Sequence, residues 1–278
     1  MTTVLTGAPR LPALLARGAV LSPFKRPRPG AEFPRTRLVL PGVRVDPARL
    51  TAYERVCGFP ADGALPVTYP HLLGFPLAMR LMSAREFPLP LLGLVHTSIE
   101  VTRHTALPAS GTYEVGVRVD RLVPHRRGTE AVVVTEVRSG DRLVWESASH
   151  YLARHRTDGQ AASAPVADPE PLPEVAEWTV PADTGRRYGA ASGDRNPIHL
   201  HPLTARLFGF PRAIAHGMWT VARCLAEHGT PDAVRVRAGF RAPVLLPAAV
   251  TYGAGDGRFE LRGAGRLHLA GEVYPLSS

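Results

Sequence analysis

The sequence predicts an α+β fold of two similar units in tandem, each with a long helix followed by antiparallel strands. An amphipathic helical pattern occurs once in each half of the 278-residue chain, and strand-like runs rich in Val and Thr follow it both times. Short matches recur in the same order in both halves, as in a duplicated sequence. Residues 156–174, rich in Pro, Ala and acidic side chains, lie between the halves and are typical of a linker.

Three short matches relate the two halves. They are residues 107–113 (LPASGTY) with 246–252 (LPAAVTY), residues 73–80 with 216–223, and residues 53–58 with 188–193. Each match is weak alone, but the shared order favours a tandem duplication in which loop lengths differ.

The first half divides into a leader, residues 1–35, and a unit of residues 36–155. We expect no regular element in the leader beyond a short helix around residues 11–15. The long helix of the unit is predicted over residues 73–82. Four strands are predicted after it, at residues 95–103, 112–122, 129–137 and 143–152.

The second unit covers residues 175–278 and repeats this order. Its long helix is predicted to begin near Gly217, because Met218, Val221 and Leu225 recur at helical spacing. Its strands are predicted at residues 234–241, 248–252, 258–262 and 267–273. In each unit a sheet would wrap the apolar stripe of the helix, which is an α+β arrangement.

Composition excludes several classes of protein. Hydrophobic residues make up 45% of the chain and charged residues 21%, as in ordinary globular proteins and unlike disordered or fibrous ones. The net charge of +9 would suit a nucleic-acid partner. However, the basic residues are scattered and all but Lys25 are arginine, which indicates a GC-rich genome more than a binding patch. We therefore expect no nucleic-acid partner.

The two cysteines, Cys57 and Cys224, are too few for a disulfide framework or a cysteine zinc site. Both lie in apolar helical patterns, so we expect them to be small core residues. No apolar run reaches the length of a membrane span, and residues 11–24 lack the features of a secretory signal. A cytoplasmic protein is therefore expected.

The most informative segment reads YGAASGDRNPIH from residue 188 to 199, and AHGM follows at residues 215–218. Gly193-Asp194 and Asn196-Pro197 are turn signals, so Asp194 and His199 flank a tight connection that can aim both side chains at one point. Each residue alone has an ordinary structural interpretation, as a turn residue, a cap or a buried core histidine.

The combined pattern resembles the hydratase 2 motif of the MaoC-like (R)-specific enoyl-thioester hydratases and 3-hydroxyacyl-thioester dehydratases. The leader, the linker and the repeated Leu-Pro-Ala segments resemble the mycobacterial double-hotdog dehydratases, type X above all. The resemblance covers nearly the whole chain and is most specific over residues 188–252. It implies a double hotdog fold, with each long helix wrapped by an antiparallel sheet.

The resemblance also assigns roles to residues. Asp194 and His199 take the positions of the catalytic pair, which adds water to the β-carbon of a trans-2-enoyl thioester. Asp194 would be the base for that water, and His199 would orient it and relay a proton to the α-carbon, work that suits groups titrating near neutrality. The amide of Gly217, at a helix start, is the candidate oxyanion donor. Asn196, His216 and Ser192 are expected to support the site.

Further groups near the motif have open interpretations. Arg195, Arg206 and Arg212 flank it and would suit the phosphates of a carrier, although ordinary solvated arginines fit as well. Asp194, His199, His201 and His216 would offer metal ligands, but nothing in the sequence fixes their geometry. We therefore expect no metal, and no flavin or nucleotide cofactor, because no convincing dinucleotide-binding glycine pattern is present.

The first half lacks the catalytic pair, since its aligned residues are Phe59 and Ala64. One active site per chain is expected. Two residues depart from the family pattern, His201 and Leu225, and the second indicates a different pocket wall, which leaves the acyl preference open.

The sequence therefore predicts a hydro-lyase acting on coenzyme A or acyl-carrier-protein thioesters, with a homodimer as a plausible assembly. Two alternatives stay open, a hydrolase of acyl thioesters and a non-catalytic partner subunit that binds them.

Overall fold

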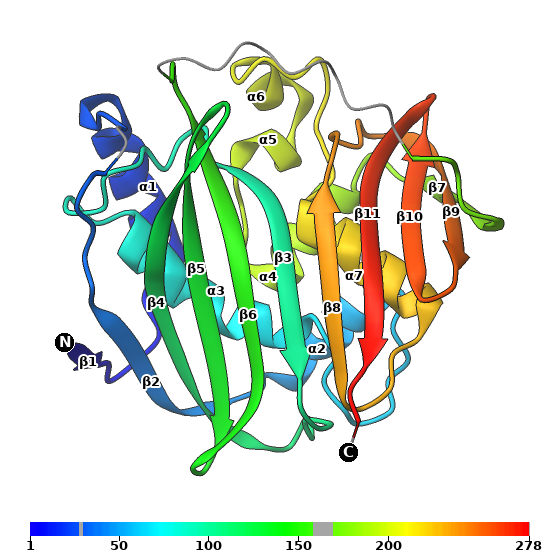
Figure 1. Cartoon of the computed structure of the whole chain (residues 1–278), viewed down its shortest axis with the longest axis horizontal. Helices are drawn as coiled ribbons and strands as arrows, with labels where there is room; N and C mark the ends of the chain where they lie inside the picture. The colour runs from blue at the N-terminus through cyan, green and yellow to red at the C-terminus, as the bar shows by residue number, and fades with distance from the viewer. Residues whose placement is uncertain (28–29, 158–168, 278) are drawn as a thin grey trace.

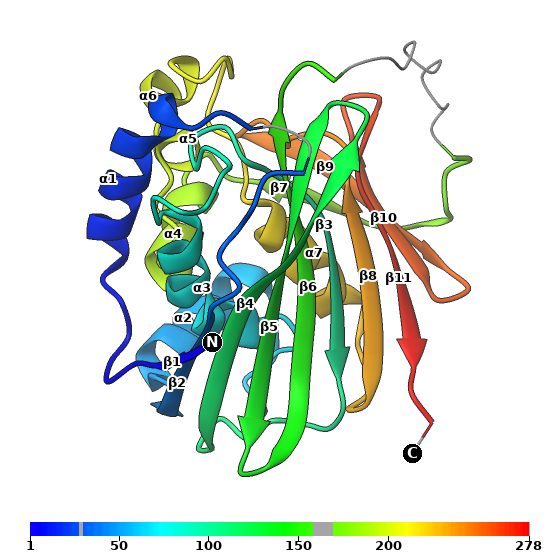
Figure 2. The ribbon, with the colours of Figure 1, turned by 60° about the vertical axis from the view of Figure 1, so that its left-hand side comes forward.

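The computed structural model of the chain describes residues 1–27, 30–157 and 169–277. One continuous sheet of eleven strands forms a face of the molecule, and the helices pack on its other side (Figures 1 and 2). No helix in the described ranges is long and apolar enough to cross a membrane.

From the second strand onward, the elements of the first half follow one another in an order that the second half repeats. They are β1 (Thr2–Val4), α1 (Leu11–Leu21), the short 3-10 helix η1 (Ser22–Phe24), β2 (Arg37–Arg44), α2 (Pro47–Cys57), α3 (Tyr69–Met82), β3 (Val95–Arg103), β4 (Thr112–His125), β5 (Gly128–Ser139) and β6 (Arg142–Arg154).

The second half inserts two short helices into the same order. Its elements are β7 (Glu174–Val180), α4 (Thr184–Ser192), α5 (Pro197–Leu200), α6 (Pro202–Arg206), α7 (Gly217–His228), β8 (Val234–Phe240), β9 (Ala248–Gly255), β10 (Arg258–Gly263) and β11 (Arg266–Pro275).

The strand order shows the duplication directly. Across the sheet the order is β1-β2-β4-β5-β6-β3-β8-β11-β10-β9-β7, so the five strands β2 to β6 mirror the five strands β7 to β11. The two halves meet where β3 pairs antiparallel with β8, from Ser98 with Gly239 to Arg103 with Val234. The predicted double hotdog is confirmed.

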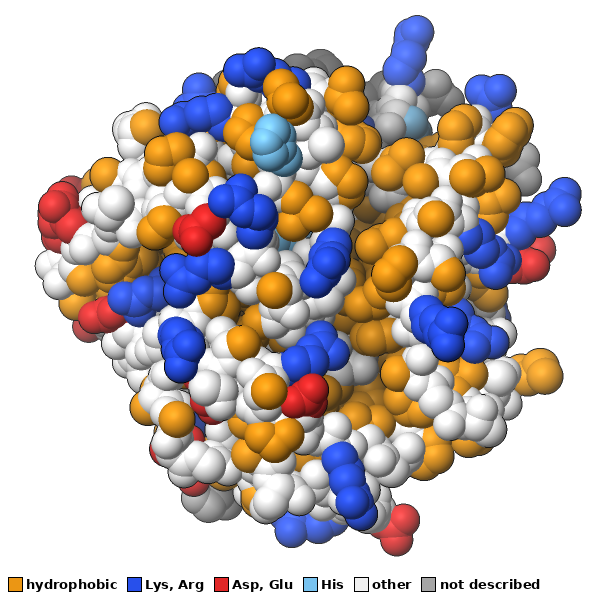
Figure 3. All heavy atoms as spheres, turned by 180° about the vertical axis from the view of Figure 1, so that it is seen from behind, with side chains coloured by type: hydrophobic (Ala, Val, Ile, Leu, Met, Phe, Trp, Pro, Cys, Tyr) orange, Lys and Arg blue, Asp and Glu red, His pale blue; other side chains and the backbone are white. Residues whose placement is uncertain are grey.

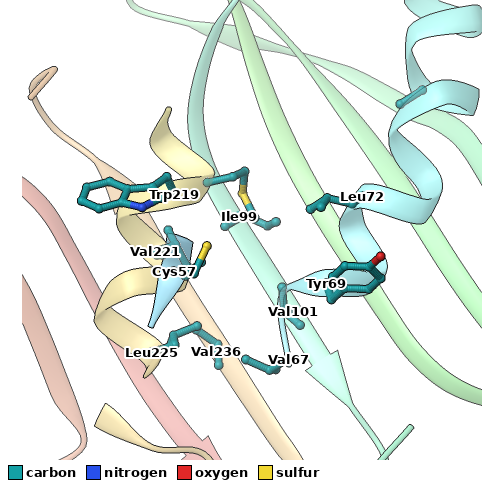
Figure 4. Packing of buried hydrophobic residues seen from close by; sticks show 14 of the residues in the cluster. Cys57, Val67, Tyr69, Leu72, Ile99, Val101, Trp219, Val221, Leu225 and Val236 are labelled. Carbon is teal, nitrogen blue, oxygen red and sulfur yellow. The ribbon is translucent and has the colours of Figure 1, made fainter. Parts of the chain in front are cut away.

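The core runs across the junction of the halves without a break. Figure 4 shows Trp219, Val221 and Leu225 of α7 packed near Ile99 and Val101 of β3, from the other half. All five side chains are at least nine-tenths buried. Both cysteines are free and buried, as predicted. This shared core holds the two units in a fixed relation, so a site built between them has rigid walls.

Eight predicted strands are present, but three others were missed. β2 and β7 each precede the helices of their unit, and β1 pairs parallel with β2. β2 contains Pro41-Gly42 beside an irregularity in its register, and β7 is an edge strand next to the predicted linker. The predicted helix from residue 73 begins one turn earlier, at Tyr69, because Pro70 is compatible with a first turn.

The leader of residues 1–35 contains more structure than expected. Its helix extends to Leu21, and Leu11, Leu14 and Leu15 pack on the core. Most of the predicted linker, residues 158–168, lies outside the described residues. Its end is held to the sheet, since Leu172 N–H donates to Glu260 Oε1 at 2.9 Å.

Candidate active site

The connection between α4 and α5 is locked by a chain of local hydrogen bonds. Gly193 ends α4 at φ +84°, a left-handed conformation that favours glycine. The Ser192 hydroxyl accepts from the Asp194 amide at 3.1 Å, and Asp194 Oδ1 accepts from the Asn196 amide at 3.1 Å. Asn196 in turn caps α5 by accepting from Ile198 N–H at 3.4 Å. The loop therefore fixes the position of the Asp194 carboxyl group.

His199 is held by a single hydrogen bond to the backbone. Its Nδ1 lies 2.8 Å from the Ile214 carbonyl oxygen. Because a carbonyl only accepts, Nδ1 carries the proton, and Nε2 of the neutral ring keeps its lone pair. The ring stacks on His216 with centroids 3.7 Å apart. His199 is therefore oriented as an acceptor for a proton at Nε2.

His216 links the two catalytic candidates. Its Nε2 donates to the backbone oxygen of Asp194 at 3.0 Å and lies 3.9 Å from Asp194 Oδ2. Polar atoms of Asp194, His199 and His216 all lie within 4.8 Å of one another. That spacing lets one water molecule contact the Asp194 carboxylate and His199 together, since each hydrogen bond spans about 2.8 Å.

Burial keeps both histidines neutral. It lowers the pKa of His199, although the nearby Asp194 and the Ile214 carbonyl act in the opposite direction. Burial, with His199 alongside, sets the pKa of His216 well below its ordinary value. The site thus combines one carboxyl group, 28% exposed at its side chain, with two uncharged imidazoles.

Gly217 lies where a backbone donor is available. It is the first residue of α7, so its amide has no acceptor within the helix. A Cβ at this position would be 2.9 Å from the Phe240 ring, closer than such contacts occur. Glycine is therefore needed for Phe240 to pack against the start of α7.

A cavity of about 630 Å³ brings the predicted site residues together. Its lining includes all six of them: Ser192, Asp194, Asn196, His199, His216 and Gly217. Seen from the helical side, the molecular surface carries a long hollow lined by hydrophobic side chains (Figure 3). The site therefore combines a polar centre with an extensive apolar lining.

The three arginines predicted as phosphate contacts do not line this cavity. All three are exposed, and Arg206 and Arg212 donate to the backbone oxygens of Pro211 and Pro247 at 3.3 and 3.4 Å. Arg154 and Arg241, which the sequence analysis did not single out, line it instead. Arg154 is the last residue of β6 and Arg241 comes directly after β8, and these two strands lie on either side of β3.

The first unit also contributes polar groups that local patterns did not reveal. His71 of α3 and His96 of β3 both line the cavity. Their Nδ1 and Nε2 atoms, respectively, are buried without a hydrogen-bond partner among the described residues, as is His216 Nδ1. Burial lowers the pKa of His71 to about 4, so its ring is neutral. A bound substrate or water is the natural partner for such atoms.

The expected absence of the catalytic pair from the first unit agrees with the geometry. Phe59 stacks on Tyr53, and Ala64 forms an isolated bridge with Pro108. Residues 58–68 join α2 to α3 directly, whereas residues 193–216 carry α5 and α6 between α4 and α7. The insertion, not the duplicated frame, supplies the candidate chemistry.

Asp194, His199 and His216 are also the described residues best placed to ligate a metal ion. His201 does not join them, because its Nδ1 caps α6 by accepting from Leu203 N–H at 3.2 Å. In the rings of both His199 and His216, one nitrogen is already hydrogen-bonded to a backbone oxygen and is not available to a metal ion. The expectation that no metal is needed stays a prediction.

Two glycines of α4 let the loop of residues 193–199 lie close to the helix. A Cβ on Gly185 would be 2.0 Å from the backbone oxygen of His199, and one on Gly189 would be 2.8 Å from that of Asp194. Glycine is normally unfavourable inside a helix, by about 1 kcal/mol relative to alanine. Glycine at these two positions therefore allows the backbone of the loop to pack directly against α4.

Substitution of Gly185 tests this fit. Gly185→Ala should lower kcat by about 100-fold, because His199 must shift and a displacement near 1 Å costs that much. Steady-state kinetics together with a thermal melt measures it. The control is Gly7→Ala, where nothing lies within 4 Å of the added Cβ. An active, more stable Gly185→Ala protein would show that ordinary helix propensity decides this position.

This fold is that of the MaoC-like dehydratases. A model of the MaoC like domain matches residues 165–253, the part of the chain that holds the candidate residues Asp194, His199 and Gly217. The chain is 38% identical over 236 residues to 3-hydroxyacyl-thioester dehydratase X of Mycobacterium tuberculosis, covering 83% of this chain and 84% of that protein. The chain belongs to the MaoC-like dehydratase family.

Two further relatives agree with this assignment. The crystal structure of HtdX of Mycobacterium tuberculosis superposes with a TM-score of 0.77 at 34% identity, covering 86% of this chain and all of that one. Peroxisomal enoyl-CoA hydratase 2 of Arabidopsis thaliana is 30% identical over 108 residues, which is 36% of this chain and 34% of that protein.

Proposed function

We propose that the chain is a hydro-lyase that reversibly hydrates trans-2-enoyl thioesters to (R)-3-hydroxyacyl thioesters. One observation carries the proposal: a fixed carboxyl group, a neutral imidazole with a free Nε2 and an unpaired helix-start amide all line one largely apolar cavity. The named dehydratase and hydratase relatives support the same reaction class.

Hydration begins with a water molecule held between Asp194 and His199. The Asp194 carboxylate accepts a proton from the water as its oxygen bonds to the β-carbon, and His199 Nε2 orients the same water. Electrons of the carbon–carbon double bond move toward the thioester oxygen, where negative charge grows. The Gly217 amide donates to that oxygen and stabilises the enolate.

Protonation of the α-carbon completes the reaction. The proton taken from water returns through the Asp194–His199 pair to the α-carbon, and the enolate collapses to the thioester. The net change is addition of H and OH across the double bond, so both residues regain their starting protonation states. Dehydration is the same sequence in reverse.

Carrier recognition and assembly remain proposals. Arg154 and Arg241 line the cavity, and their guanidinium groups suit the phosphate of a coenzyme A or phosphopantetheine arm. We further propose that no metal or redox cofactor takes part. The predicted homodimer and cytoplasmic location also remain predictions.

The decisive experiment is an assay of the purified protein with trans-2-enoyl-CoA esters, following loss of the conjugated double bond and the stereochemistry of the product. Metal-independent formation of (R)-3-hydroxyacyl-CoA, unchanged after EDTA treatment, is expected. Release of free thiol would instead identify a thioesterase. Binding without turnover, for enoyl-CoA and enoyl-carrier-protein alike, would identify a non-catalytic subunit.

The pH profile tests the state of His199. Because burial lowers its pKa, the ring is mostly neutral at pH 6.5 and becomes mostly protonated only as pH falls further. We expect kcat/KM for hydration to stay level from pH 8 to about 6.5 and to fall only below that. Circular dichroism at each pH separates this loss from acid unfolding, since buried neutral histidines also lose their stabilising contribution below pH 6.5. A decline that begins above 6.5 contradicts the assignment.

A further inference from the structure

The cavity extends beyond the catalytic centre along one face of α3. His71, Leu72, Phe75, Met79 and Met82 of this helix all line it. The first of them lies near the catalytic centre, since the Asp194 charge acts on the pKa of His71. From His71 to Met82 the helix advances about 16 Å. After His71, every side chain of this set is apolar.

Helix α1 of the leader packs beside α3 and also lines this apolar stretch. Its residues Leu15, Ala16 and Ala19 line the same cavity, together with a loop that includes Leu91 and Leu94. The two alanines leave space that larger side chains would fill. The leader, for which the sequence indicated no role, thus borders the continuation of the active site.

The position of α1 is fixed by specific contacts. Gly18 is buried against Leu91, so that a Cβ there would be 2.2 Å from Leu91 Cδ2. The Ser22 hydroxyl accepts from Leu92 N–H at 2.9 Å. Lys25, the one lysine of the chain, donates to the backbone oxygens of Met82 and Ala84 at 3.3 and 2.9 Å, beyond the end of α3. These contacts therefore hold α1 in a fixed position beside the cavity.

We propose that α1 closes the acyl end of the substrate cavity, and that this cavity takes 2-enoyl groups of about a dozen carbons. The inference rests on the proposed function and adds its substrate class. The length follows from the α3 wall, because an extended chain with C–C bonds of about 1.5 Å advances roughly 1.25 Å per carbon. The occupant is an acyl chain, because the apolar stretch is continuous with the site that holds the thioester.

Bulky substitutions on α1 test the proposal. In Ala19→Phe and Ala16→Phe, the ratio of kcat/KM for C12 to that for C4 enoyl-CoA should fall about tenfold or more. If the bulky ring keeps two or three methylene groups of the substrate out of the cavity, kcat/KM for the C12 substrate loses their burial energy, which is worth roughly a fourfold change for each group. Ala13→Phe is the matched control, because Ala13 lies on the same helix and is exposed like Ala16, but does not line the cavity. It should leave the ratio unchanged.

A second measurement uses the unaltered protein and does not depend on variants that fold. A C12 acyl-CoA carrying a terminal diazirine should, after irradiation, label α1 or the neighbouring Met79 and Met82. Labelling confined to other segments, or an unchanged C12 to C4 ratio in folded Ala19→Phe, overturns the proposal. Absence of turnover by the unaltered protein at every enoyl chain length, C4 and C12 included, would be a failure of the proposed function itself.

Discussion

Asp194→Asn should lower kcat for enoyl-CoA hydration by roughly 10²–10⁴-fold, the usual contribution of a general base. Asparagine has the shape of aspartate and keeps a side-chain oxygen. That oxygen can accept the hydrogen bond from the backbone N–H of Asn196, which now lies 3.1 Å from Asp194 Oδ1. It cannot take a proton from water. The backbone oxygen of Asp194, which receives the His216 hydrogen bond, is unaffected by the change. The loss should therefore lie in kcat, with the melting temperature nearly unchanged.

The matched control is Asp141→Asn, the same change in the exposed turn between β5 and β6. It should leave kcat within about twofold, as surface changes away from a site usually do. A tenfold or smaller loss in Asp194→Asn, from a protein that still melts cooperatively, would remove Asp194 from the role of base. If a large loss of kcat is accompanied by unfolding, the measurement is repeated with Asp194→Ser, which keeps a small hydrogen-bond acceptor near the loop.

The turn that holds Asp194 could be predicted from sequence because its geometry is local, whereas His199, His216 and Gly217 were assigned through the resemblance to the hydratase 2 motif. Gly193, Asp194 and Asn196 are each positioned by bonds to residues two to four positions away. Turn chemistry of this kind is visible as residue types at fixed spacing. The six residues predicted as catalytic, oxyanion-binding or supporting line one cavity, whereas the three arginines predicted as phosphate contacts do not, and the roles of all nine remain predictions.

What the sequence did not reveal depends on contacts between distant segments. His71 and His96 enter the cavity only because β3 of the first half pairs with β8 of the second. Gly185 looks like a weak helix position until the His199 backbone is placed against it. Arg154 and Arg241 are far apart in the chain, but they lie at the ends of the two strands that flank β3. No local pattern encodes such proximity.

In the fold, too, the features encoded by local patterns were predicted and those that depend on distant contacts were missed. The long helices and the strands after them were predicted, because their apolar residues recur with the right periods. The missed strands β2 and β7 precede their helices, and they pair mainly with β4 and β9, which come later in the chain. The leader was missed as a structural part because its apolar residues are interrupted by Pro12, Arg17 and Pro23. Packing against α3 and Leu91 overrides that weak pattern.

His199→Gln should reduce kcat by a similar factor, roughly 10²–10⁴-fold. Glutamine retains an N–H that can reach toward the Ile214 carbonyl, which His199 Nδ1 now contacts at 2.8 Å. It offers no nitrogen lone pair to orient or deprotonate a water molecule. His201→Gln is the control, since His201 is exposed, caps α6 and lies outside the cavity lining. Full activity in His199→Gln, with stereochemistry intact, would mean that Asp194 works alone.

The double variant Asp194→Asn with His199→Gln decides whether the two residues act as one unit. Groups that handle the same proton give strongly non-additive losses, so the double variant should be within about tenfold of the worse single variant. Independent roles would instead multiply, to about 10⁴-fold or more in kcat. The shared water inferred from atoms within 4.8 Å of one another requires the first result. Multiplied losses would mean that the base for water and the donor to the α-carbon are separate groups, and that the proton does not pass between them.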